Sequence, residues 1–232
     1  MALNRWSAMQ EWFSVLRDAL DDDDETVRQA ASWAVDRAEH FASPNKIRDM
    51  TRSGSDTATR LAAIDCLGEF EDVGATELLA EILANDPVSE VRAAAITALS
   101  QIGTGAAVGA LAVGVDDKDD FIAAAAAKAL GRCGDSKAEQ KLLEMLNSAS
   151  PTRAAAAAEA LGAIGSVGAA PALVAALSSD STEVQRAAAK ALGQVGPEET
   201  WVPLAESAKS PEPRVRREAV RALGLLSGRL PF

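Results

Sequence analysis

The sequence predicts an all-α protein, a solenoid of about seven two-helix repeats. Three observations lead to this prediction. A nine-residue pattern recurs along the chain every 31–32 residues. Of the 232 residues, 50 are alanine, the best helix former, and only 4 Trp, 5 Phe and no Tyr are present to favour strands. A fixed period of this length is typical of stacked repeats that bury one continuous core between neighbours.

The recurring pattern is expected to form the second helix of each repeat. Its seven copies end at Val35, Leu67, Leu99, Leu130, Leu161, Leu192 and Leu223. A glycine then follows the helix at Gly103, Gly134, Gly165 and Gly196. Glycine adopts the left-handed conformation that closes a helix, so each of these is predicted to be a helix end. A second glycine recurs near the end of the same helix and predicts close helix contacts at Gly68, Gly131, Gly162, Gly193 and Gly224.

The first helix of each repeat is shorter, and we expect it over residues 76–84, 138–146 and 170–177 in three of the copies. Polar turns precede the second helices, and the acidic run at 21–25 is expected to cap the helix that follows it. The whole chain, 1–232, is therefore predicted to be one solenoid domain. Residues 1–43 would be its N-terminal capping repeat and residues 199–232 its C-terminal capping repeat.

Two copies show the pattern most clearly. Residues 91–103 read VRAAAITALSQIG, and residues 184–196 read VQRAAAKALGQVG. The pattern resembles the HEAT-like repeat of the phycobilisome-lyase type, over residues 12–226. This resemblance implies an α-solenoid, and the group includes bilin lyase subunits and interaction scaffolds. It also implies an arginine that bonds neighbouring turns. That arginine is present at Arg28, Arg60, Arg92 and Arg216, and is replaced by Ala123, Ala154 and Gln185.

Charge is distributed unevenly along the chain. The net charge is −11, and residues 1–116 hold 9 basic and 20 acidic residues, whereas residues 209–232 hold six basic and two acidic ones. Such an acidic protein is not expected to bind nucleic acid. Its uneven charge is explained either by solubility and chance or by two ends that meet different partner surfaces. The sequence has no secretory signal and no apolar run long enough to cross a membrane, which predicts a cytoplasmic protein without membrane contact.

Catalytic chemistry is not predicted. His40 is the one histidine, which excludes a His-based triad or a multi-His metal site within this chain. Cys66 and Cys133 fall on core positions of the repeat, two repeats apart, and are expected to be free thiols that pack as small apolar side chains. No glycine-rich loop has phosphate-binding spacing. We therefore expect no catalytic residue, no metal site and no cofactor.

The predicted binding surface is the concave face, which the second helices line in this class of repeat. Its N-terminal end would be acidic and carry a tryptophan, its centre would be lined by alanine, and its C-terminal end would be basic. A graded surface of this kind suits an elongated protein partner, such as a helix or a tail. The candidate partner-binding residues are Trp33, Asp36, Asp65, Thr97, Lys128, Glu159, Arg186, Lys190, Arg217 and Arg221.

Three functional hypotheses follow. The first is a non-catalytic scaffold or adaptor that binds another protein along the concave face. The second, implied by the resemblance, is a phycobilin lyase subunit or chromophore chaperone. It would bind an open-chain tetrapyrrole whose propionates meet Arg186, Lys190 or Arg221. The third, a HEAT-like DNA glycosylase, is disfavoured by the net charge of −11 and by the acidic surroundings of Trp33.

Overall fold

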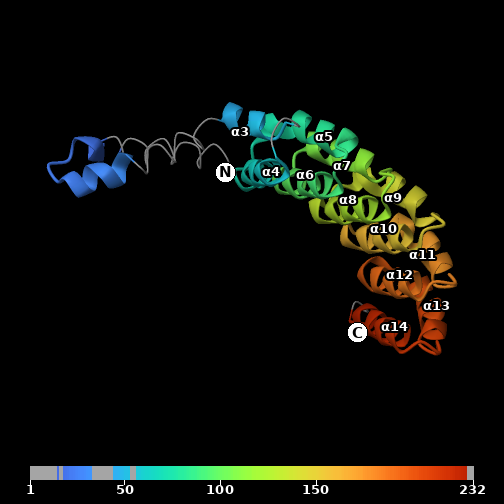
Figure 1. Cartoon of the computed structure of the whole chain (residues 1–232). Helices are drawn as coiled ribbons and strands as arrows, with labels where there is room; N and C mark the ends of the chain where they lie inside the picture. The colour runs from blue at the N-terminus through green and yellow to red at the C-terminus, as the bar shows by residue number, and fades with distance from the viewer. Residues whose placement is uncertain (1–14, 16–17, 33–43, 53–55, 229–232) are drawn as a thin grey trace.

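The computed structural model describes residue 15 and residues 18–32, 44–52 and 56–228 of the chain. Over these residues the regular structure is entirely helical, which confirms the predicted all-α class. Helices of residues 44–228 stack in succession and form an arc (Figure 1). The predicted capping repeat at 1–43 lies largely outside the described residues.

The helices alternate between a shorter and a longer one, as the repeat predicts. The shorter helices form the outer side of the arc (Figure 1). They are α3 (Pro44–Met50), α5 (Thr76–Asn85), α7 (Gly105–Gly114), α9 (Glu139–Leu146), α11 (Ala170–Ala176) and α13 (Trp201–Ser207). The longer helices form the inner side. They are α4 (Thr57–Glu69), α6 (Ser89–Ile102), α8 (Asp120–Cys133), α10 (Pro151–Ala163), α12 (Thr182–Val195) and α14 (Pro213–Ser227).

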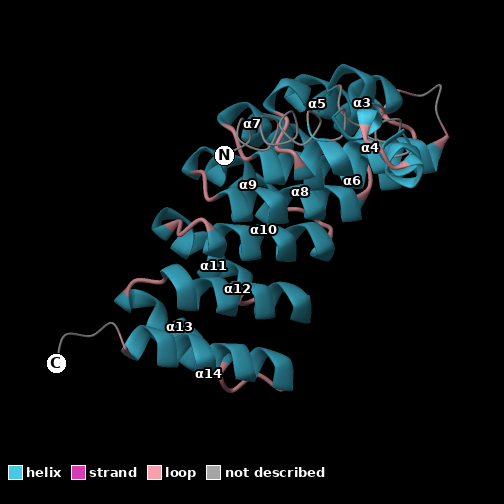
Figure 2. Ribbon diagram, turned by 90° about the vertical axis from the view of Figure 1, so that its left-hand side faces the viewer, coloured by secondary structure: helices cyan, strands magenta, loops and turns pink. Residues whose placement is uncertain are grey.

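The inner helices stack side by side along the arc (Figure 2). The recurring glycine makes this approach possible. A Cβ placed on Gly162 would lie 2.8 Å from the Cα of Ala191 in the next inner helix, and one on Gly193 would lie 2.7 Å from the Cα of Ala222. Gly68 and Gly131 meet Ala98 and Ala160 in the same way, so the predicted close contacts are confirmed at these four glycines.

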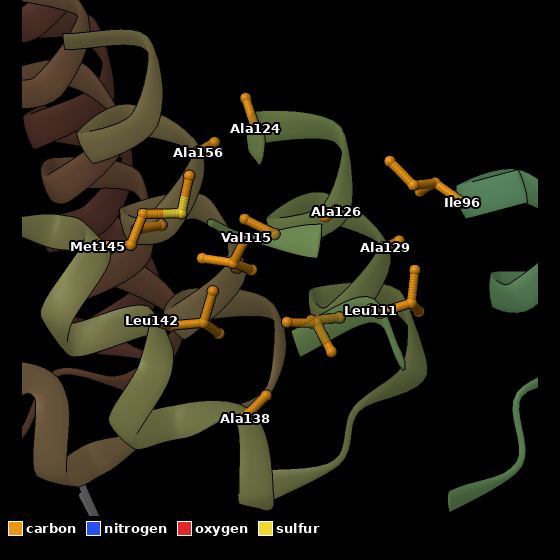
Figure 3. Packing of buried hydrophobic residues seen from close by; sticks show 14 of the residues in the cluster. Ile96, Leu111, Val115, Ala124, Ala126, Ala129, Ala138, Leu142, Met145 and Ala156 are labelled. Atoms are coloured by element: carbon orange, nitrogen blue, oxygen red, sulfur yellow. The ribbon is translucent and has the colours of Figure 1, made fainter. Parts of the chain in front are cut away.

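The core lies between the inner and outer rows. Leu111 and Leu142 of the outer helices are completely buried against alanines of the inner helices, among them Ala126 and Ala129 (Figure 3). Alanine on the inner helices lets neighbouring inner helices approach each other, while leucine on the outer helices fills the volume between the two rows. Each repeat thus shares its core with the next, and no single helical pair encloses a core alone.

The left-handed conformation predicted for the closing glycines is found at three of four positions. Gly103, Gly134 and Gly165 have φ angles of 61°, 68° and 75°. Helix α12 also ends at Gly196, as predicted, but this glycine is extended, with φ of −63° and ψ of 129°. Pro197 follows it, and the ring of a proline forces the preceding residue into an extended conformation.

The turns between outer and inner helices share a polar residue whose side chain accepts the backbone N–H two residues later. It is Asp22, Asp86, Asp117, Ser148, Ser179 or Ser210, depending on the repeat. This contact closes the turns before residues 25–32 and before the inner helices α6 to α14, because a short polar side chain reproduces a backbone turn.

In the N-terminal half, buried ion pairs connect successive turns. Arg92 donates to the backbone oxygen of Asp86 in its own turn and to both carboxylate oxygens of Asp117 in the next, at 2.7 and 3.0 Å. The side chains of this pair are only 4% and 6% exposed. Arg60 forms the equivalent buried pair with Asp86. The arginine that the resemblance implied therefore bonds neighbouring turns, as expected.

Further along, the arginine is absent and the connection changes. Between the α7–α8 and α9–α10 turns, Asp120 accepts hydrogen bonds from Ser150 at 2.5 Å and Arg153 at 2.6 Å. Arg153, one residue before Ala154, thus supplies a link that Ala123 lacks. Between the next two turns, Ala154 and Ser179 instead line a cavity of about 250 Å³.

Candidate functional site

The concave face is the exposed side of the six inner helices, α4 to α14, which look toward the inside of the arc (Figure 1). Most of the predicted partner-binding positions that the structure describes are exposed there. Asp65, Thr97, Lys128, Lys190, Arg217 and Arg221 are exposed, and Glu159 and Arg186 are half-buried. Trp33 and Asp36 lie outside the described residues, as does His40.

Three of the half-buried and exposed charges form a connected row across α8, α10 and α12. Glu159 lies 3.9 Å from the Nζ of Lys128 and 3.1 Å from a guanidinium nitrogen of Arg186. Arg186 also contacts Glu183 at 3.1 Å. Burial lowers the pKa of Arg186, but its hydrogen bonds to Glu159 and Glu183 outweigh that effect and raise it. The sequence placed Arg186 among cations that face a partner, whereas the structure commits it to internal ion pairs.

A shallow cavity of about 240 Å³ opens beside this row. Its floor is alanine, and charged side chains form its rim. The residues that line it are Ala124, Lys128, Pro151, Thr152, Ala155, Ala156, Glu159, Glu183 and Arg186. The smooth alanine centre that the sequence predicted is therefore a small depression with ion-paired walls.

The basic end of the face differs from the centre. Lys190 forms no ion pair with a described residue. Arg217 and Arg221 lie 3.3 and 3.9 Å from the carboxylate of Glu218, which is itself nearly buried. One carboxylate thus faces two arginines, so positive charge remains exposed at this end.

Phe121 is a feature of this face that the sequence reasoning missed. It lies at the start of α8 and is 77% exposed. One repeat further on, the same position is Thr152, which lines the cavity beside Glu159. The other repeats carry alanine, a polar residue or a charged residue at this position. The single aromatic residue at this repeat position was therefore the signal in the sequence that could have indicated Phe121. Exposed aromatic side chains are enriched among the residues that dominate protein interfaces.

The two cysteines are free and half-buried. Burial raises the pKa of the Cys66 thiol, and the nearby carboxylates of Glu69 and Asp65 raise it further. Burial also raises the pKa of Cys133. Both thiols are therefore mostly protonated at neutral pH, which is the unreactive form.

Within the described residues, no group of three His, Cys, Asp or Glu side chains is arranged to hold a metal ion. The same part of the chain contains no helix with the length and apolar character of a membrane span.

The family model for HEAT repeats matches residues 44–127, 111–183 and 170–230. The chain belongs to the HEAT-repeat family. The matches together span most of the arc of helices, so the predicted resemblance to a HEAT-like repeat is confirmed. No curated protein matches this chain by sequence.

Solved structures give the same fold. The complex of CpcE and CpcF of phycocyanin lyase from Nostoc sp. PCC7120 is 27% identical, with a TM-score of 0.58, over 78% of this chain and 76% of that one. A designed armadillo repeat protein in complex with the peptide (KR)4 is 21% identical, with a TM-score of 0.55, over 78% and 98% of the two chains. An engineered protein is 24% identical, with a TM-score of 0.53, over 93% and 98%.

Proposed function

We propose that this protein is a non-catalytic scaffold or adaptor that binds an elongated segment of another protein along the concave face. The observation that carries the proposal is the continuity of that face over six inner helices, with an exposed aromatic residue near its middle and unneutralised positive charge at its C-terminal end. Repeat solenoids use extended concave surfaces of this kind to bind partners.

The position of Phe121 indicates where the contact is centred. It lies on the same helix as Ala124 and Lys128, about one turn and two turns away, and these two residues line the 240 Å³ cavity. A partner side chain inserted in the cavity would meet its alanines, and a neighbouring part of the same segment would meet the exposed ring of Phe121. Lys190 on α12 and Arg221 on α14 lie two and three inner helices further along the face. They would then meet acidic groups of the same segment.

Site-specific photo-crosslinking tests this proposal. A photoreactive amino acid replaces Phe121 in one variant and Val202 in another, and each is exposed to lysate of the native host. Val202 is the matched control because it is 74% exposed on α13, on the outer side of the arc. We expect a protein adduct at position 121, its loss when Lys190→Glu and Arg221→Glu are added, and no such adduct at position 202. Equal adducts at both positions, or none at 121, would contradict the proposal.

A second candidate function is that of a phycobilin lyase subunit or chromophore chaperone, which the likeness to the phycocyanin lyase complex favours. A tetrapyrrole would place its propionates against the exposed cations Lys190 and Arg221, since Arg186 is already paired with Glu159 and Glu183. Titration with an open-chain tetrapyrrole would then shift its visible absorbance, and Lys190→Glu with Arg221→Glu would abolish the shift. An unchanged spectrum would reject this candidate.

A further inference from the structure

Helix α14 exposes positions that every internal repeat buries. Val220 is 59% exposed. One and two repeats earlier the same position is Ala189 and Ala158, both completely buried, and Ile96 in α6 is 2% exposed. No further described helix follows α14, so Val220 lies where the next inner helix of a stack would cover it.

The recurring glycine gives an independent sign of the same open surface. At Gly193, a Cβ would lie 2.7 Å from the backbone of the next helix. At Gly224, the corresponding position in α14, nothing described lies within 4 Å. The space that a neighbouring helix occupies at each of the four earlier glycines is therefore open at the last one.

Arg216 is the third sign. It stands at the repeat position of Arg92 and donates to the backbone oxygens of Ser210 and Pro211 in its own turn, both at 2.7 Å. Arg92 does the same with Asp86 and in addition binds the carboxylate of Asp117 in the next repeat. Among the described residues, no carboxylate lies within ion-pair distance of Arg216.

The missing carboxylate has a counterpart at the other end of the chain. Asp22 precedes Arg28 by six residues, as Asp86 precedes Arg92. Its Oδ1 accepts the N–H of Asp24 at 2.9 Å, which is the turn geometry of Asp86 and Asp117. Those two carboxylates each bind an arginine of the preceding repeat. Arg28 donates to the backbone oxygen of the exposed Asp22, but no described arginine or lysine lies within ion-pair distance of the Asp22 carboxylate.

We propose that α14 of one copy stacks on the described segment 18–32 of a second copy, with Arg216 bound to the partner's Asp22. The stacking register is that of the internal repeats. Charge favours this occupant, because residues 209–232 carry six basic and two acidic residues while residues 21–25 are all acidic. Two α14 helices would instead bring Arg216, Arg217 and Arg221 against their own copies.

This contact joins two different surfaces, so a dimer still has one open surface at each end and longer assemblies grow from it. It uses the ends of the solenoid rather than the concave face. The inference is therefore independent of the proposed function.

Sedimentation velocity of the full chain, over a wide range of concentration, tests the inference. We expect the average mass to rise with concentration and to fall with added salt, because an exposed charge pair is screened. Arg216→Glu or Asp22→Arg should each weaken association roughly tenfold or more, since each leaves one charge facing a like charge. Lys190→Glu makes the same charge change as Arg216→Glu at an exposed concave position and should leave the mass unchanged.

Mixing the two variants gives the decisive result. Arg216→Glu retains Asp22 and Asp22→Arg retains Arg216, so these two surfaces bind each other. The two reversed charges also face each other with opposite sign, so the mixture should recover the association that each variant alone lacks. Circular dichroism first confirms that both variants keep the wild-type helix content. A wild-type chain that stays monomeric at all concentrations, or an association that neither variant weakens, would overturn the inference.

Discussion

The two halves of the solenoid have the same helices but connect their turns differently. In the N-terminal half, Arg60 and Arg92 reach from one turn to the carboxylate of the next, and both pairs are buried. In the C-terminal half, the corresponding residues are Ala154 and Ser179, and a cavity of about 250 Å³ lies between them. From α4 to α12, the arginine and the aspartate of the next turn are present together or absent together, which indicates that they form one structural unit.

The largest expected effect comes from breaking that unit on one side. Arg92→Ala leaves the buried carboxylate of Asp117 without its partner, and removing one member of a buried pair costs about 3–5 kcal/mol of the free energy of unfolding. Urea denaturation would measure the loss. Gln185→Ala is the matched control in the C-terminal half, because Gln185 contacts only the backbone oxygen of Ser179 in its own turn. A similar loss for both variants would contradict the comparison.

The glycine contacts test the ends of the solenoid against its interior. Gly193→Ala pushes a Cβ into the backbone of α14, and we expect a loss of about 1–3 kcal/mol from overpacking. Gly224→Ala meets open space and should gain up to about 1 kcal/mol from helix propensity. Thermal unfolding at low protein concentration compares the two, and equal losses would show that α14 has a close neighbour.

Acid should affect the two halves unequally. Burial raises the pKa of Asp117, but the hydrogen bonds from Arg92 and from the backbone of Asp119 outweigh it and hold the pKa below its ordinary value. A carboxyl whose pKa is lower when folded stabilises the protein above its unfolded pKa of about 4, and this contribution disappears as the pH falls through the folded value.

The loss on acidification should be smaller than that of Arg92→Ala, because a protonated Asp117 still accepts a hydrogen bond. Hydrogen exchange read by mass spectrometry at neutral pH and below pH 4 would measure this loss. As the pH falls, α6 and α8 should lose their protection from exchange at a higher pH than α12. Simultaneous loss of protection in all three helices would argue against the assignment to Asp117.

The smallest effect is expected from converting the C-terminal turn into the N-terminal type. Ala154→Arg with Ser179→Asp rebuilds the buried pair at the cavity, with a change in stability within about 1 kcal/mol. The amides of residues 177–181 should nevertheless exchange more slowly. Ala154→Arg alone is the control, and equal protection in both variants would show that the aspartate is dispensable.

The period and the glycine positions were sufficient to predict the helices, because these depend on contacts within a repeat and with its neighbour. The exception was the left-handed conformation expected at Gly196, since Pro197 adds a restriction that the repeat pattern does not contain. The role of Arg153 was missed because it lies one residue away from the repeat position that the resemblance singled out.

On the concave face, the exposed positions were predictable, whereas their partners were not. Arg186 on α12 and Glu159 on α10 are 27 residues apart and meet between neighbouring inner helices. Such a contact depends on how far each side chain reaches. The alternating signs of Lys128, Glu159 and Lys190 along one row were the available hint. Phe121 could not be predicted from the repeat pattern, because the other repeats carry no aromatic residue at its position.

The polar turn that precedes each inner helix from α6 to α14 has a consequence for how the chain folds. Each turn is closed by a contact between residues two apart, so its formation does not depend on any distant part of the chain. Proteins dominated by such short-range contacts fold quickly, and in repeat arrays folding starts at any unit and spreads to its neighbours. The turns held together by Arg60 and Arg92 are then the natural place for folding to begin, and the C-terminal repeats the place where unfolding starts.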